Sequence, residues 1–287
     1  MQDLKGATAI VTGGSRGLGP YIARALAREG MNVALAARDG AKLESVQKEI
    51  EALGVRALSI PTDVNQPDDR TRLIERAASE LGPIDLLVNN AGVEPTSAFV
   101  DIAESAITGT IQTNLTSCLL LMRLVLPDMV ARKRGHVVNI ASMAGKIPIP
   151  YDSVYSATKF ALVGVSHAVR SELRGSGVGL SVVCPGFIDE AGMYADAVDE
   201  TGVSAPAIAG TSKPEQVADA VVRAVKRNVA EVIVTPITGR PLAAAAALVP
   251  SFGQTMMRLT GVQGAFKHMA DARAENARAE NARVGNN

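Results

Sequence analysis

Short apolar runs alternate with longer amphipathic stretches along most of this chain. The runs are continuously apolar, which is the pattern of strands that are buried on both faces of a sheet. Seven of them predict strands at residues 7–12, 32–36, 55–60, 84–88, 136–140, 179–183 and 231–235.

The stretches between these runs have helical spacing. In the first stretch, Ala23, Leu26 and Ala27 share one face of a helix, whereas Arg24 and Arg28 lie on another. Helices are predicted over residues 18–29, 41–53, 68–81, 102–133, 153–176 and 214–226. This repeated strand–helix order predicts an α/β fold, namely a doubly wound, Rossmann-type, seven-stranded parallel sheet with helices on both faces.

No linker interrupts residues 1–240, which we interpret as a single dinucleotide-binding catalytic domain. Residues 190–212 break the strand–helix rhythm beyond a strand end, where α/β sheets bind ligands. A lid and a plain surface excursion both fit this segment.

Residues 241–287 are interpreted as a C-terminal extension. The part at 241–262 is apolar, and Pro250, Gly253 and Gly261 are expected to break it. We expect this part to cover the lid, a neighbouring subunit or a membrane surface. The pentapeptide AENAR then occurs twice at 274–283, and a five-residue period keeps no single helix face, which predicts a polar, solvated and frayed helix.

The composition narrows the possible functions. The 287 residues include 29 Lys and Arg and 29 Asp and Glu, so the formal net charge is zero. This balance argues against binding to nucleic acid or an anionic membrane, which needs a cationic field. No apolar run is long enough for a transmembrane helix, and no secretory signal is recognised. Cys118 and Cys184 lie in apolar runs, as buried thiols of a cytoplasmic protein would, and no His/Cys cluster indicates a metal site.

Two turns of small residues follow predicted strands. In TGGSRGLG, Gly13, Gly17 and Gly19 allow the backbone to approach a pyrophosphate, whose charge would meet the free N–H groups of the next helix. The sequence NNAG at 89–92 would let a cofactor ring lie close to the backbone. Either segment alone is also compatible with an ordinary turn.

Four further residues are candidates for proton chemistry. Tyr155 and Lys159 are four residues apart, so both project from one helix face. An ammonium beside a phenol favours the phenolate and lowers the pKa of the phenol, which makes Tyr155 a candidate general acid/base. Ser142, after the strand at 136–140, could reach the same space. Asn114 is polar within an apolar helix and needs a partner, either a water chain or a backbone carbonyl. The alternative is a chance Tyr/Lys pair on an amphipathic helix.

These motifs together closely resemble the short-chain dehydrogenase/reductase family. They are TGGSRGLG, NNAG, Asn114 in TNLTS, Ser142 in IASMAG, Tyr155 and Lys159 in YSATK, and CPG at 184–186. The resemblance covers residues 5–236, and the tail lies outside the usual core of the family.

The resemblance implies a role for each matching residue. Tyr155 would donate or accept the proton, while Ser142 would hydrogen-bond the substrate oxygen. Lys159 would bind the nicotinamide ribose and depress the pKa of Tyr155. Asn114 would hold a water that relays protons from Lys159. The expected cofactor contacts are Gly13, Ser15, Arg16, Gly17, Leu18, Gly19, Arg38, Asp63, Val64, Asn90, Ala91, Gly92, Tyr155, Lys159, Pro185, Gly186 and Ile188.

The end of the second strand favours NADP(H) over NAD(H). NAD-dependent members of the family place an acidic residue where this chain has Ala37, and alanine leaves room for a 2′-phosphate. Arg38 and Arg16 could bind that phosphate through charge-assisted hydrogen bonds. Asp39 could instead neutralise part of the charge of Arg38, and NAD(H) is a possible cofactor as well.

One position departs from the family pattern, because Glu190 stands where a Thr commonly bonds the nicotinamide carboxamide. The predicted pocket walls are 93–98, 143–152 and 187–206. They include Ile147, Ile149, Tyr151, Phe187, Met193 and Tyr194 and carry no basic cluster, which suits a lipophilic alcohol or ketone. Glu94 and Asp152 are equally compatible with solvated loop charges.

We therefore expect an NADP(H)-dependent oxidoreductase that transfers a hydride between nicotinamide and a secondary alcohol or ketone. A non-catalytic nicotinamide-nucleotide-binding sensor or scaffold on the same fold is the alternative. Apolar surface on the helices at 102–133 and 153–176 predicts a homodimer or homotetramer, since these helices commonly pair across a two-fold axis in the family. Packing of all this surface on the chain's own sheet is the other possibility.

Overall fold

All seven predicted strands form one parallel sheet. The computed structural model describes residues 3–236 and 239–284, and its strand order is β3-β2-β1-β4-β5-β6-β7. The strands are β1 (Thr8–Thr12), β2 (Asn32–Ala37), β3 (Ala57–Pro61), β4 (Ile84–Asn89), β5 (Gly135–Ile140), β6 (Val178–Pro185) and β7 (Glu231–Val234). Every pairing is parallel. The order reverses between β1 and β4, so the carboxyl ends of these strands flank the crevice in which such sheets bind ligands.

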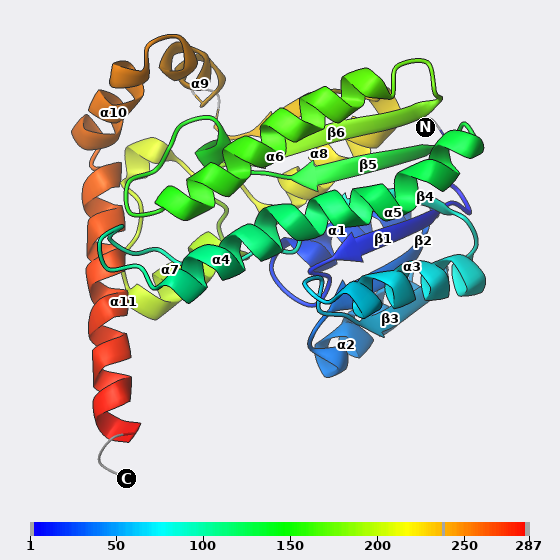
Figure 1. Ribbon diagram of the computed structural model, residues 1–287, viewed down its shortest axis with the longest axis horizontal. Coiled ribbons are helices and arrows are strands. Elements are labelled where there is room, and N and C mark those ends of the chain that lie inside the picture. Colours follow the sequence, from blue (N-terminus) through cyan, green and yellow to red (C-terminus); the bar gives the residue numbers. More distant parts are fainter. Residues whose placement is uncertain (1–2, 237–238, 285–287) are drawn as a thin grey trace.

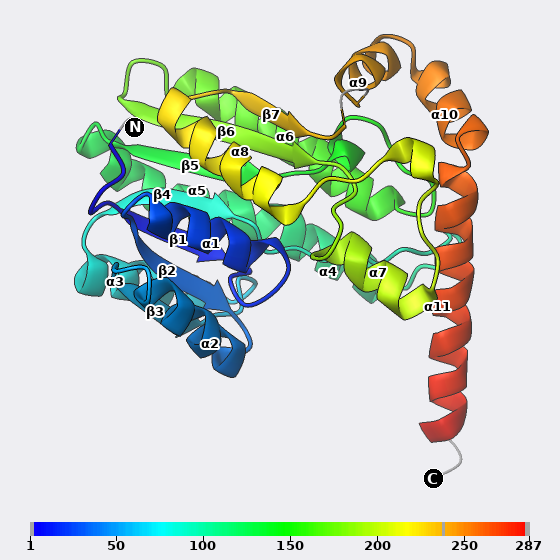
Figure 2. The same cartoon turned by 180° about the vertical axis from the view of Figure 1, so that it is seen from behind.

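Helices cover both faces of the sheet, which confirms the predicted fold class (Figure 1; Figure 2). One face carries α1 (Leu18–Arg28), α2 (Gly40–Glu51) and α8 (Pro214–Arg227). The other carries α3 (Pro67–Leu81), α5 (Ser117–Ala131) and α6 (Ser153–Glu172). The helices α4 (Glu104–Ile111), α7 (Met193–Thr201), α9 (Gly239–Leu248), α10 (Pro250–Leu259) and α11 (Val262–Val284) lie toward the carboxyl ends of the strands (Figure 1).

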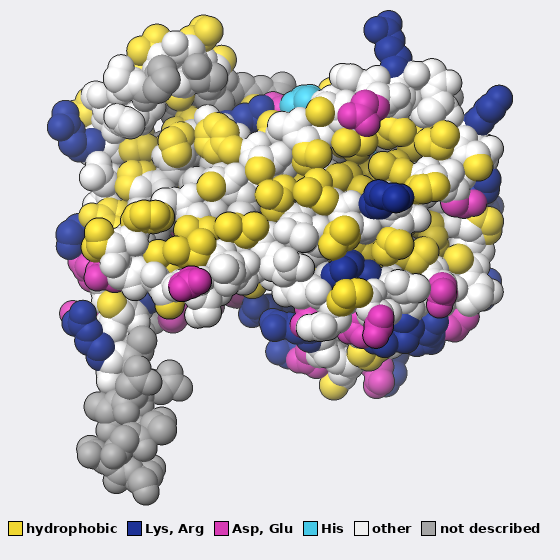
Figure 3. Space-filling view, viewed as in Figure 1, with side chains coloured by type: hydrophobic (Ala, Val, Ile, Leu, Met, Phe, Trp, Pro, Cys, Tyr) yellow, Lys and Arg dark blue, Asp and Glu magenta, His cyan; other side chains and the backbone are white. Residues whose placement is uncertain are grey.

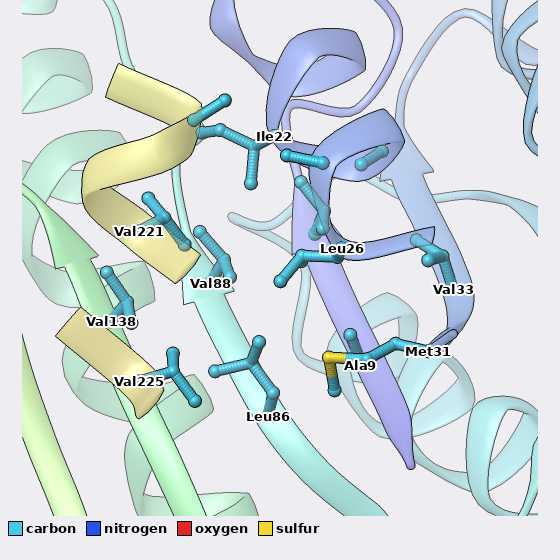
Figure 4. Close-up of a cluster of buried hydrophobic side chains, with 14 of the residues drawn as sticks. Ala9, Ile22, Leu26, Met31, Val33, Leu86, Val88, Val138, Val221 and Val225 are labelled. Atoms are coloured by element: carbon cyan, nitrogen blue, oxygen red, sulfur yellow. The ribbon is translucent and has the colours of Figure 1, made fainter. Parts of the chain in front are cut away.

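The core is aliphatic and lies on both sides of the central strands. Figure 4 shows one part of it, where Ile22 and Leu26 of α1 and Val221 of α8 pack over Leu86 and Val88 of β4. These five side chains are fully buried, and so the two central strands are fixed between helix layers. A rigid sheet centre holds the loops at the strand ends in place.

The long helical stretch predicted at 102–133 is interrupted. A π-helical segment, η1 (Gln112–Thr116), separates α4 from α5 and contains Asn114. Each π turn takes in one more residue than an α turn, so the face that α4 presents is rotated relative to that of α5. The hydrophobic pattern could not reveal this, because it stays apolar through both helices.

The tail forms three helices, and one of its predicted breaks is wrong. Pro250 starts α10, and Gly261, with φ of 78°, lies between α10 and α11. Gly253 instead lies inside α10, where a Cβ atom would come within 3.0 Å of the Ala246 Cβ of α9. Glycine is therefore needed there for the close approach of two helices. The AENAR repeats continue α11, and their fraying stays a prediction.

One stretch of the described chain, Glu104–Ala131, is long and apolar enough to cross a membrane by length and composition alone. This differs from the expectation drawn from the sequence. Core helices pass the same test, and the inner side of α5 buries Leu121, Met122, Val125 and Met129 against the sheet. Cys118 and Cys184 are both buried and free, and they belong to one cluster between α5, α6 and β6.

Candidate active site

Three of the four residues predicted for proton chemistry, Ser142, Tyr155 and Lys159, meet in one cavity at the carboxyl ends of the strands. Ser142 follows β5 and starts the short helix η2 (Met143–Gly145), where its Oγ accepts a hydrogen bond from the Ala144 N–H at 3.1 Å. Tyr155 and Lys159 lie in the first two turns of α6. All three line a cavity of about 500 Å³.

The ammonium group of Lys159 is buried and held by the backbone. Its Nζ donates a hydrogen bond to the Ile140 carbonyl at 2.9 Å and lies 5.3 Å from the centroid of the Tyr155 ring. Burial lowers the pKa of Lys159, and none of the described carboxylates forms an ion pair with it. An ammonium has three donors, so two are left for ligands in the cavity.

The structure contradicts the expected lowering of the Tyr155 pKa. Burial raises this pKa well above its usual value, and the charge of Glu94 raises it further. The hydrogen bond with Ser142 opposes this only in part. Lys159 is not among the causes that set this pKa. Tyr155 is therefore a neutral phenol, which is the form that donates a proton.

Asn114 is fully buried and braces the loop after β4. Its amide Nδ2 donates to the Val93 carbonyl at 2.8 Å, and its Oδ1 accepts from the Val93 N–H at 2.8 Å. The partner is therefore the backbone, one of the two alternatives that the sequence left open. The proposed water relay through Asn114 stays a prediction.

The glycine-rich turn lies at the start of α1 and forms one edge of the cavity. Gly13 and Gly17 have φ of 65° and 60°, the left-handed region in which glycine is favoured. A Cβ atom on Gly19 would collide with the Gly13 carbonyl. No side chain caps the helix start. The turn can therefore hold a phosphate group against backbone N–H donors, as a pyrophosphate site requires.

Thr12 is a structural part of this site that the sequence interpretation missed. Its Oγ1 accepts hydrogen bonds from the Asn90 N–H at 2.9 Å and the Ala91 N–H at 3.1 Å. The Asn90 side chain in turn donates to the Thr12 carbonyl at 2.9 Å. These bonds join the two small-residue turns, and Asn90, Ala91 and Gly92 all line the cavity. A threonine at the end of an apolar strand was the available signal.

Five predicted cofactor residues lie outside the lining of this cavity, namely Ser15, Gly19, Arg38, Asp63 and Val64. Ser15 and Gly19 belong to the glycine-rich turn, whose other predicted residues do line it. Arg38 follows β2 and is exposed, while Asp63 and Val64 follow β3. The Asp63 carboxylate accepts from the Asn65 N–H at 3.0 Å. The carboxyl ends of β2 and β3 neighbour that of β1, so these residues extend the same crevice, and their contacts with the adenosine half stay a prediction.

The predicted nicotinamide cover is present as a wall of the cavity, except at Glu190. Pro185, Gly186 and Ile188 all line it. The Glu190 side chain is 59% exposed and lies 3.8 Å from the Lys213 ammonium. It does not line the cavity. The residue that departs from the family pattern therefore faces solvent.

The outer walls come partly from the predicted segments and partly from the tail. Ile147, Ile149, Phe187, Met193 and Tyr194 line the cavity as expected, whereas Tyr151 does not. The tail adds Met256, Met257, Phe266 and Met269 from α10 and α11. Phe266 approaches Phe187 with ring centroids 6.1 Å apart. The tail therefore covers the chain's own lid, one of the three possibilities that the sequence left open.

Asp152 is not a solvated loop charge, whereas Glu94 is half-buried. Asp152 is only 1% exposed, and Glu94 lines the cavity. Burial and the neighbouring Glu94 raise the pKa of Asp152 well above its usual value. Within residues 3–236 and 239–284, no group of three or more His, Cys, Asp or Glu is placed to hold a metal ion.

Comparison with known proteins agrees with this geometry. A family model described as short chain dehydrogenase matches residues 7–202. The ketoacyl reductase HetN of Nostoc sp. (strain PCC 7120) is 45% identical over 240 residues, which are 83% of this chain and 82% of that protein.

Solved structures show the same similarity. A metagenomic short-chain oxidoreductase in complex with NADP has a TM-score of 0.70 and 34% identity, over 82% of this chain and 98% of that one. A variant of actinorhodin polyketide ketoreductase with NADPH has a TM-score of 0.76 and 31% identity, over 81% and 97%.

The parallel sheet and its cavity at the strand ends define a nucleotide-dependent oxidoreductase fold. The chain belongs to the short-chain dehydrogenase/reductase family. It is an oxidoreductase that acts on CH–OH or C=O groups with a nicotinamide cofactor.

Proposed function

We propose that this protein is an NADP(H)-dependent reductase or dehydrogenase of lipophilic secondary alcohols and ketones. The observation that carries the proposal is the convergence of Ser142, Tyr155 and Lys159 on a cavity whose lining is mainly apolar. The glycine-rich turn fits a dinucleotide. A side chain on Gly19 would collide with the Gly13 carbonyl, so glycine at this position allows the tight turn that a dinucleotide site needs.

The residues of this chain bind, orient and supply a proton. The cofactor, when bound, supplies or accepts the hydride. Tyr155, held as a neutral phenol, donates a proton to the substrate oxygen in the direction of reduction. The Ser142 hydroxyl orients that oxygen. Lys159 offers its free donors to the cofactor ribose, and its charge favours the phenolate that forms as Tyr155 gives up its proton.

The cavity wall supports a lipophilic substrate. Five of the nine methionines in the chain line it, namely Met143, Met193, Met256, Met257 and Met269. Methionine is unbranched and adapts to flexible apolar groups. Relatives named as ketoacyl reductases favour an acyl-chain ketone within this class.

NADP(H) is the proposed cofactor in preference to NAD(H). Solved relatives carry NADP or NADPH, and here Arg38 is exposed at the end of β2. Asp39 does not neutralise it, since its carboxylate caps α2 through the Lys42 N–H at 3.0 Å and lies 3.4 Å from the Lys42 ammonium. Those contacts lower the pKa of Asp39.

A test follows nicotinamide absorbance with a panel of ketones of increasing chain length. We expect oxidation of NADPH by lipophilic ketones and its near-complete loss in Tyr155→Phe. The alternative function, a non-catalytic nucleotide-binding sensor or scaffold, predicts nucleotide binding without turnover of any ketone. Wild-type rates in Tyr155→Phe would contradict the proposed proton transfer.

We also propose a cytoplasmic homodimer or homotetramer. Figure 3 shows a broad apolar band on the face that carries α4, α5 and α6. Ile111, Leu120, Leu124 and Phe160 are exposed large apolar residues of these helices. Such a surface suits a self-complementary contact across a two-fold axis. The two free, buried thiols favour a reducing compartment.

A further inference from the structure

Arg273 of α11 joins two segments that lie far apart in the sequence. Its Nε donates a hydrogen bond to the Glu200 carboxylate of α7 at 3.0 Å, and the two side chains form an ion pair. Its Nη1 donates to the Glu94 backbone carbonyl, in the loop after β4, at 3.0 Å. Both contacts belong to one planar guanidinium, so they fix its orientation as well as its charge. The Arg273 side chain is only 20% exposed, which shields it from most of the solvent.

Both partners of Arg273 belong to walls of the cavity. The loop after β4 and the helix α7 each contribute several lining residues, namely Gly92, Glu94 and Thr96 from the loop and Met193, Tyr194 and Ala197 from α7. In the described part of the chain, no hydrogen bond or ion pair runs directly between residues 92–98 and α7. The polar link between these two walls therefore passes through Arg273.

The tail holds α7 at both of its ends. At the first turn, Tyr194 packs on Phe187 with ring centroids 4.9 Å apart, and Phe187 in turn approaches Phe266 of α11. At the last turn, Glu200 makes the ion pair with Arg273. The two helices accordingly lie side by side in both views (Figure 1; Figure 2). The first contact is apolar and the second is polar, so a substitution of Arg273 releases the last turn alone.

The loop after β4 is likewise held from two elements. Asn114 of η1 binds the Val93 backbone through two hydrogen bonds of 2.8 Å. Arg273 binds the backbone of the next residue, Glu94. The loop is thus a fixed point, and Arg273 connects α7 to it.

We propose that Arg273 is a positioning residue that sets the width of the substrate end of the cavity by tying α7 to the loop after β4. The inference rests on the proposed function. Without the guanidinium, the half-exposed Glu200 carboxylate can turn to water, and the last turn of α7 loses its polar anchor. The apolar walls then contact a ketone less closely, so KM rises. Ser142, Tyr155 and Lys159 come from other elements, so kcat and the affinity for NADPH are kept.

The test measures kcat and KM for a medium-chain methyl ketone at saturating NADPH. Arg273→Ala should raise KM by about tenfold, as expected for the loss of one charge-assisted contact, with kcat close to that of wild type. Glu200→Ala should raise KM less, because Arg273 keeps its bond to Glu94. The double variant should be no worse than Arg273→Ala, since both substitutions remove the same contact.

Lys267→Ala is the matched control. Lys267 is another cation of α11, but its ion pair with Asp271, at 2.7 Å, stays within the helix. This variant should keep the wild-type KM, so it separates the link to α7 from a general effect on the tail. Arg273→Lys keeps the charge with one nitrogen in place of the two that Arg273 uses, and its KM should lie between those of wild type and Arg273→Ala.

Hydrogen exchange followed by mass spectrometry, with NADP⁺ bound, reads the same link without turnover. Residues 92–98 and α7 should exchange faster in Arg273→Ala than in wild type or Lys267→Ala. An unchanged KM in Arg273→Ala, an equal rise in Lys267→Ala, or effects that multiply in the double variant would overturn the positioning role. Absence of turnover in the wild type would contradict the proposed function, whereas unchanged exchange in both segments would contradict the link itself.

Discussion

Replacing Arg38 by alanine should weaken the binding of NADPH much more than that of NADH. Arg38 is exposed where β2 ends, and it forms no ion pair or hydrogen bond with any described residue. Asp39, the nearest acid in sequence, is occupied by the start of α2 and by Lys42. The guanidinium is thus free to bind a 2′-phosphate, and no internal contact has to be broken first.

The magnitude follows from the kind of contact. A hydrogen bond to a charged group contributes about 1.5–3 kcal/mol, which corresponds to about a tenfold to hundredfold change in affinity. The contribution of Arg16 to the same phosphate should be smaller, since it lies 3.7 Å from the Asp196 carboxylate of α7 and both side chains are mostly exposed. Arg38→Ala should therefore raise the dissociation constant for NADPH by about ten- to a hundredfold.

Calorimetric titration of each cofactor into wild type and variant measures this directly. Arg28→Ala is the matched control, because Arg28 is an exposed arginine at the far end of α1, away from the strand ends that bind the cofactor. It should leave both affinities unchanged. Equal losses for NADPH and NADH in Arg38→Ala, or a wild-type preference for NADH, would refute the interpretation of this strand end.

Four further predictions address other parts of the molecule. Tyr155→Phe should keep nucleotide affinity while Lys159→Ala loses it, as titration would show; equal affinities would contradict the role of Lys159 at the ribose. The pKa of His136 is lowered to about 3 by burial, so stability falls as the pH drops below about 6.5, by about 2 kcal/mol between about pH 7 and 5. Denaturant unfolding should show this loss in wild type but not in His136→Asn. Phe160→Glu should yield monomers by light scattering if α6 lies in the subunit interface, and an unchanged mass would reject that surface. Truncation after Arg240 should raise KM for long-chain ketones about tenfold or more, with little change for short ones, because it removes the Met256 wall.

The fold was predictable because each element depends on local periodicity. Continuous apolar runs located all seven strands to within two residues at each end. Helical spacing located the helices between them except α7, which lies inside the segment interpreted as a lid or a surface excursion. The π segment at Asn114 was not predictable, because its apolar pattern matches that of an uninterrupted helix. Gly253 was misjudged for a related reason, since a glycine that breaks a helix and one that allows close packing look alike in sequence.

The site was only partly predictable, because sequence spacing locates side chains but not their surroundings. The four-residue spacing of Tyr155 and Lys159 correctly predicted a shared helix face. The direction of the Tyr155 pKa shift depends on how deeply the ring is buried and on Glu94, whose position in the cavity depends on tertiary contacts. For the wall formed by α10 and α11, the sequence left three possible surfaces open, since no local pattern shows which surface a tail helix will cover.

The depth of burial also bears on how the site works. A phenol exposed beside a lysine would ionise more readily, as the spacing alone suggested, and would then act as a base. Here the cavity walls remove solvent from Tyr155 and hold its proton in place, and the carboxylate of Glu94 strengthens that effect. The same walls bury the Lys159 ammonium, whose pKa is lowered. A donor phenol beside a desolvated ammonium favours proton transfer to an alkoxide that forms next to them, because the ammonium then gains a phenolate neighbour. The helices of the tail contribute Phe266 and Met269 to the lining of the same cavity, so a segment outside the matched family region helps to form the proposed substrate pocket.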